Sequence, residues 1–126
     1  MRRSSLLAKI LPPSGRRPRP RILVDVAGFA VETLGRDGMR RLFREWGAID
    51  RAEAFKRDLY AVDLICLELR AHGEWVEVDE EMTGWDDLLR ELPERLPGAL
   101  ARDDLYAAVM KPAFAECRTR VFERIA

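Results

Sequence analysis

Side chains that carry out nucleophilic and metal chemistry are scarce in this chain of 126 residues. The chain has one histidine and two cysteines, and its three serines all lie within the first 14 residues. A serine or cysteine nucleophile needs a base within hydrogen-bond reach, and a transition-metal site needs several histidine or cysteine ligands. We therefore expect a non-enzymatic protein without catalytic residues, metal ligands or a bound cofactor.

The histidine and the cysteines are also poorly placed for catalysis. Cys66 lies inside the apolar run 64–67 and is expected to be a small core residue. His72 is expected in the turn beyond that strand, which places it about 20 Å from Cys66 at the usual strand rise. A pairing of His72 with Cys117 stays open. Because the cysteines are not spaced as a CxxC pair, we expect reduced thiols and a cytoplasmic location.

Long apolar runs and phosphate-binding loops are missing too. No stretch of about 18 apolar residues occurs, so we expect no transmembrane segment. The short apolar stretch at residues 6–11 is interrupted by Lys9 and makes a poor secretory signal. Neither GxxxxGKS/T nor GxGxxG is present, which argues against a phosphate-binding loop.

Charge is balanced in total but not along the chain. The 22 basic residues equal the 22 acidic ones, yet residues 1–21 hold seven bases and no acid. Four of the seven prolines also lie within the first 20 residues, which predicts a disordered Pro/Arg-rich tail over 1–20. Such a tail is either solvated or in contact with nucleic acid or acidic lipid. Residues 22–126 hold 15 bases against 22 acids, a net charge of −7.

Alternating and β-branched apolar residues predict strands after the tail. We expect a hairpin that begins at Arg21, with its turn at 25–28, and a second turn at 35–38. The strand that follows, 39–45, is expected to place on one face Met39, Arg41 and Phe43.

The strand pattern continues beyond Trp46. Residues 52–56 favour a strand, and a helix over 48–58 is an open alternative. Residues 62–69 are apolar on both faces, which is typical of a central strand. This strand is expected to pair back with 75–78 through a turn at 71–73.

A helical period replaces the alternation after residue 83. The spacing i, i+3, i+4, i+7 predicts a helix over about 84–96, with an apolar face of Trp85, Leu88, Leu89 and Leu92. We expect Thr83 to be the N-cap, with Asp86 completing a pair like a capping box, and Pro97-Gly98 to end the helix. A second helix is expected to be capped by Asp103 or Asp104 and to end at Lys111-Pro112. Residues 113–126 favour either a further helix or a loop and a short strand.

Acidic side chains crowd into residues 74–87, where there is no base. The seven acids are Glu74, Glu77, Asp79, Glu80, Glu81, Asp86 and Asp87. They form either a solvated loop at the positive end of a helix or a docking surface for a basic partner. Trp75 and Trp85 lie beside them, and aromatic side chains often anchor interfaces, although both could belong to the core. The predicted partner-binding residues are Trp75, Glu77, Asp79, Glu80, Glu81, Asp86 and Asp87.

A series of short motifs appears in order along residues 21–96. They are Gly28-Phe29, Trp46, Ile49-Asp50, Ala54–Asp58, Asp63–Leu67, Trp75–Val78, Glu80-Glu81, Gly84–Leu88, Leu92-Pro93 and Leu96–Gly98. This order resembles the pleckstrin-homology-like domains of small, uncharacterised bacterial proteins. The resemblance implies strands, a tryptophan-marked bend, further strands and one capping helix. The first hairpin turn carries no lysine or arginine, so phosphoinositide binding is not implied.

Together these patterns predict an α+β fold, a bent antiparallel sheet (pleckstrin-homology-like) capped by one helix, with a helical C-terminal extension. The predicted divisions are a tail (1–20), an α+β domain (21–98) and an extension packed on that domain (99–126). The leading hypothesis is a non-catalytic bacterial binding protein whose acidic face docks a basic protein partner, for example in immunity-type neutralisation of a toxin. The alternatives are a carboxylate-based hydrolase using residues 77–87, or peripheral membrane or nucleic-acid contact through the basic tail.

Overall fold

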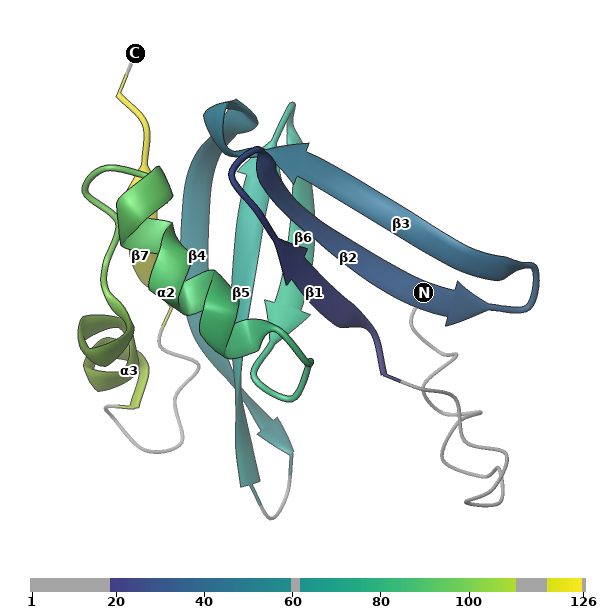
Figure 1. Cartoon of the computed structure of the whole chain (residues 1–126). Coiled ribbons are helices and arrows are strands. Elements are labelled where there is room, and N and C mark those ends of the chain that lie inside the picture. Colours follow the sequence, from purple (N-terminus) through teal and green to yellow (C-terminus); the bar gives the residue numbers. More distant parts are fainter. Residues whose placement is uncertain (1–18, 60–61, 111–117, 126) are drawn as a thin grey trace.

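The computed structural model describes residues 19–59, 62–110 and 118–125. Within them the chain forms two antiparallel sheets, two α-helices and one short 3-10 turn (Figure 1). In chain order the elements are β1 (Arg21–Val24), β2 (Gly28–Gly35), β3 (Gly38–Glu45), η2 (Trp46–Ala48), β4 (Ile49–Leu59), β5 (Val62–Ala71), β6 (Glu74–Asp79), α2 (Trp85–Arg95), α3 (Arg102–Met110) and β7 (Thr119–Glu123). The fold class is α+β, as predicted.

The first sheet has the order β1-β2-β3 and is built from two consecutive hairpins. The predicted turn at 25–28 is confirmed, because the Asp25 carboxylate accepts the backbone N–H groups of Ala27 and Gly28 at 2.8 and 3.1 Å. The predicted turn at 35–38 is also confirmed, and only Arg36 and Asp37 separate the paired residues at its ends. Short loops of this kind hold consecutive strands in antiparallel register.

The second sheet has the order β6-β5-β4-β7. β5 is one of its two interior strands and carries fully buried side chains on both faces, including Cys66 and Leu67, which confirms the predicted central strand. The helix considered over 48–58 is wrong. β4 is an extended strand because its backbone pairs with β5 on one side and with β7 on the other.

α2 begins at Trp85, one residue later than a helix capped by Thr83 would begin. The N-cap is Gly84, at φ 95°, and no side chain caps the helix, so the Thr83 capping box is wrong. The Thr83 carbonyl instead accepts the N–H of Ile22 at 2.7 Å, which ties β1 to the start of the helix. A Cβ atom on Gly84 would lie 2.0 Å from the carbonyl oxygen of Ile22, so this close approach requires glycine.

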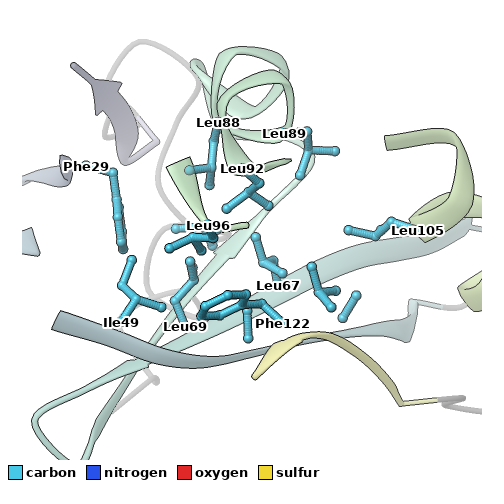
Figure 2. Packing of buried hydrophobic residues seen from close by; sticks show 14 of the residues in the cluster. Phe29, Ile49, Leu67, Leu69, Leu88, Leu89, Leu92, Leu96, Leu105 and Phe122 are labelled. Atoms are coloured by element: carbon cyan, nitrogen blue, oxygen red, sulfur yellow. The ribbon is translucent and has the colours of Figure 1, made fainter. Parts of the chain in front are cut away.

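The apolar face of α2 covers one side of the second sheet (Figure 1). The predicted face is confirmed, since all four of its members are buried, namely Trp85, Leu88, Leu89 and Leu92. Pro93 lies inside the helix, which continues to Arg95. Figure 2 shows these leucines directed at side chains of the strands below, among them Ile49, Leu67, Leu69 and Phe122.

The C-terminal part contributes to the same core. α3 begins at Arg102, so neither Asp103 nor Asp104 caps it and both lie in its first turn. Leu105 of α3 is fully buried in the cluster that also contains the α2 leucines. Of the two possibilities for 113–126, the structure has a strand over 119–123, while 113–117 lie outside the described residues.

The predicted tail is almost wholly outside the described residues. Of residues 1–20 only Arg19 and Pro20 are described, and neither belongs to a helix or strand. In the part of the chain that is described, no helix is long and apolar enough to cross a membrane.

Gly84→Ala should destabilise the protein more than the same change at Gly98. Both glycines have positive φ, at 95° and 91°, but an added Cβ meets the Ile22 carbonyl only at position 84. We expect a loss of about 1 kcal/mol for Gly98→Ala from left-handed backbone strain alone. The loss for Gly84→Ala should reach about 3 kcal/mol. Urea unfolding of both variants measures the difference, and equal losses would contradict the proposed tie between β1 and α2.

Candidate docking surfaces

The acidic segment, residues 74–87, runs over three different structural elements. Its members on β6 are Glu74, Trp75, Glu77 and Asp79, those in the following turn are Glu80 and Glu81, and those in the first turn of α2 are Asp86 and Asp87. β6 is an edge strand of the second sheet. The acids therefore follow the chain across an edge, a turn and a helix start.

Arginines already neutralise most of this acidic segment. The ion pairs are Glu74–Arg44 (3.0 Å), Glu77–Arg57 (2.8 Å), Asp79–Arg19 (3.6 Å), Glu81–Arg19 (3.2 Å), Asp86–Arg102 and Asp87–Arg90. Six of the seven acids thus meet five arginines, and all of these arginines except Arg90 come from elements other than those of the segment. The surface carries much less net negative charge than the sequence alone implies.

Two residues of the acidic segment have structural roles. Asp79 is buried, and its carboxylate accepts the backbone N–H of Glu81 at 3.0 Å, which closes the turn after β6. Trp85 is buried as well, and its indole N–H donates to the Tyr106 hydroxyl at 2.9 Å, which links α2 to α3. Trp85 is thus a core residue and not an exposed anchor.

Trp75 and Glu80 are the members of the segment best placed to meet a partner. The Trp75 side chain is 42% exposed, and the Arg70 guanidinium lies 5.5 Å from its ring centre. Glu80 makes no ion pair with any described residue. Partial burial raises the pKa of its carboxyl group, and the neighbouring charges of Glu81 and Asp79 raise it further.

The candidate nucleophile Cys66 is inaccessible. Its side chain is fully buried, as predicted, and burial raises the pKa of the thiol to about 11. His72 is exposed in the β5–β6 turn, also as predicted, and Cys117 lies outside the described residues. Among the residues that the structure describes, no three histidine, cysteine or carboxylate side chains are grouped to hold a metal ion.

The carboxylates of the acidic segment do not gather in the hollow beside α2. A hollow of about 380 Å³ lies between the β1–β2 turn and α2, and of the segment only Asp87 lines it. Elsewhere, arginine partners hold the pKa values of Asp50 and Glu53 below their ordinary range. Asp50 accepts a hydrogen bond from Arg70, and Glu53 accepts one from Arg51. A general acid needs the opposite shift beside a second, ionised carboxylate, and among Asp50, Glu53 and Glu80 only Glu80 has a raised pKa.

A second surface was not anticipated from the sequence. The outer part of the β2–β3 hairpin, residues 31–44, extends away from the helices and the second sheet (Figure 1) and is called the arm below. Four large apolar side chains on it are at least 40% exposed, namely Leu34, Met39, Leu42 and Phe43. The predicted face of Met39, Arg41 and Phe43 forms, but it faces solvent and not a core.

The base of the arm is held tightly where β2 meets β3. Phe29 is buried and packs against Trp46, with ring centres 6.1 Å apart. A Cβ atom on Gly28 would lie 2.0 Å from the carbonyl oxygen of Arg44, so the strands approach here more closely than any other residue would allow. The arm therefore leaves the body from a fixed point.

The arm carries four arginines and two acids. Arg41 pairs with Glu32 at 3.1 Å, and Arg44 pairs with Glu74 at 3.0 Å. Arg36 and Arg40 make no ion pair with a described residue. Exposed apolar groups are thus interleaved with cations, two of which are unpaired.

Cys66 should resist modification in the folded protein. In a Cys117→Ser background, which leaves Cys66 as the single thiol, we expect reaction with DTNB at pH 8 to be at least 100-fold slower than in 6 M guanidinium chloride. Because burial raises the thiol pKa from 9.0 to about 11, deprotonation favours the unfolded chain, and stability should fall as pH rises from about 9 to 11. Cys66→Ala in the same background should lessen this fall. Rapid labelling of the native protein would show that the site is open.

Comparisons with protein-family models, with curated proteins and with solved structures found no match. Inference about what the chain does therefore depends on the two surfaces described above, the acidic segment and the arm.

Proposed function

We propose that the protein is a non-catalytic binding module that docks a protein partner through the arm. The observation that carries this proposal is the exposure of Leu34, Met39, Leu42 and Phe43 on both faces of one projecting hairpin. Large apolar side chains that gather in solvent on one element often mark an interaction site. Methionine, aromatic residues and arginine are also the types enriched at protein interfaces.

The charge of the arm favours a protein partner over nucleic acid. Four arginines against two acids leave a modest positive charge, and Arg41 and Arg44 are already ion-paired. Nucleic-acid affinity comes mainly from many bases that neutralise phosphates. The arm offers more apolar contact area than unpaired positive charge, and apolar area suits the interior of a protein interface.

The acidic segment is the second candidate surface, for a basic protein partner. Trp75 is exposed there and Glu80 has no cation partner among the described residues. Ion pairs between exposed side chains contribute only about 0–1 kcal/mol each, so a basic partner could displace the arginines at small cost. Neutralisation of a basic toxin by an immunity-type protein would use such a surface.

The pleckstrin-homology-like assignment is likewise a proposal. Six antiparallel strands in two sheets, followed by a helix that packs on one of them, support it. β7 follows that helix and pairs with β4, and the complete pleckstrin plan has seven strands before its helix. A bacterial, cytoplasmic protein of this kind would use the fold as a scaffold for binding.

Met39 and Met110 provide a matched test of the arm, because their side chains are 58% and 54% exposed on different elements. In affinity capture from the native host, Met39→Ser combined with Phe43→Ser should reduce recovery of the partner at least tenfold. Met110→Ser should leave recovery unchanged, since its surface lies on α3. Circular dichroism and urea unfolding check that all variants remain folded.

Charge reversal distinguishes the two surfaces in the same experiment. The reversed residues are Glu80, Glu81, Asp86 and Asp87, each changed to Lys. We expect the partner to be recovered as with the wild type, because the arm makes the contact. Loss of the partner with the reversed protein, together with full recovery by the arm variant, would transfer the function to the acidic segment.

A further inference from the structure

β3 is the longest unpaired sheet edge in the described part of the chain. It pairs with β2 over all eight of its residues, without a register shift, and no strand lies on its other side. Alternate residues of such a strand turn their N–H and C=O groups toward the free edge. Natural proteins usually protect such edges with charged side chains, proline, bulges or covering elements. β3 carries arginines but no lysine, proline or bulge.

The other edges of the two sheets are protected. β1 has four residues and is tied to the start of α2 through Ile22 and Thr83. β7 has five residues, and its pairing with β4 shifts in register. β6 has six residues, and its carboxylates Glu74 and Glu77 are held in ion pairs by arginines of other strands. Among the strand edges that the structure describes, only β3 combines length, regular pairing and exposed apolar side chains.

We infer that a partner protein adds an extended acidic segment to the free edge of β3 as a fourth strand of the first sheet. This inference rests on the proposed binding function and specifies the partner of the same surface. Main-chain hydrogen bonds to the edge provide affinity, and the side chains on the two faces provide specificity.

The side chains of β3 define the pattern that the added strand must present. One face carries Met39, Arg41 and Phe43, and the other carries Arg40, Leu42 and Arg44. Directly opposed residues on neighbouring strands interact, with opposite charges and apolar pairs both favourable. An antiparallel strand that places acids opposite the arginines and valines opposite the apolar residues has the sequence EVVEEV.

A second copy of this chain fits the edge poorly. When two identical strands pair in antiparallel fashion about a two-fold axis, the axis passes between two directly opposed residues. Those two residues are therefore the same residue of the two copies. If the axis lies at Arg40 or Arg41, that arginine faces the same arginine of the other copy. If the axis lies at Leu42, Arg40 of each copy faces Arg44 of the other, so like charges are opposed twice. Centring on Phe43 restricts the overlap to residues 41–45. The cations of β3 therefore select an acidic partner strand.

Binding of a fluorescein-labelled EVVEEV peptide, flanked by Gly-Ser spacers, tests the charge pattern. By fluorescence anisotropy, the full-length protein should bind this peptide at least tenfold more tightly than the matching KVVKKV peptide. Arg40→Glu should weaken binding at least fivefold, because Arg40 makes no ion pair with a described residue. Arg120→Glu, at an exposed arginine on edge strand β7, should change it less than twofold. Equal binding of both peptides, or of neither, overturns the inference.

Amide hydrogen exchange tests strand addition itself. With EVVEEV bound, alternate amides over residues 39–45 should become protected, since only every second N–H of β3 faces the free edge. Peptide binding without that alternation overturns strand addition, while the host-partner experiment with Met39→Ser and Phe43→Ser still decides the binding function separately. A concentration-dependent dimer in light scattering that Leu42→Lys abolishes overturns the acidic partner in favour of a second copy.

Discussion

The Trp46 corner determines how the two sheets relate to each other. The indole N–H donates to the Asp25 carbonyl at 2.9 Å, and the Trp46 backbone N–H donates to the Ala27 carbonyl at 3.2 Å. The ring packs on buried Phe29, so the first hairpin turn is fixed against the junction of β3 and β4. Arg124, beyond β7, donates to the Trp46 carbonyl at 3.2 Å. One residue thus connects the first sheet, the second sheet and the C-terminal strand.

This corner forces the outer hairpin away from the core. Ile22, Phe29 and Ala30 are the buried apolar residues of β1 and β2, and Val24 and Val31 pack against the same core. Beyond Val31 most residues of the hairpin are exposed. Full burial of a large apolar side chain contributes roughly 1.5–3 kcal/mol, and the half-exposed residues of the arm forgo a substantial part of it. The remaining core tolerates this loss because the α2 leucines pack over β4 and β5. The arm therefore projects into solvent because of the fold, and not because the chain has too few hydrophobic residues.

Local patterns in the sequence predicted the elements but not their long-range partners. The leucine spacing of α2 and the alternation in β5 are local signals, and both were confirmed. The sequence did not predict Gly84 as the N-cap, because glycine is required there by the close approach of the Ile22 carbonyl, more than 60 residues away. The acidic segment was overestimated for the same reason, since Arg19, Arg44 and Arg57 reach it only in the folded chain. The exposure of the arm could not be predicted, because an alternating sequence pattern shows which residues share a face of a strand but not what covers that face.

The contrast between β6 and β3 bears on why the arm is exposed. Both strands are sheet edges, and β6 is protected by carboxylates that are themselves held by arginines. The balanced total charge of the chain comes from a basic first segment and an acidic remainder, and not from an absence of charged surface. β3 carries arginines instead, of which Arg40 has no acid partner among the described residues, beside Leu42 and Phe43 in solvent. Unpaired cations keep two such edges from pairing with each other, and they leave the strand open to an acidic one.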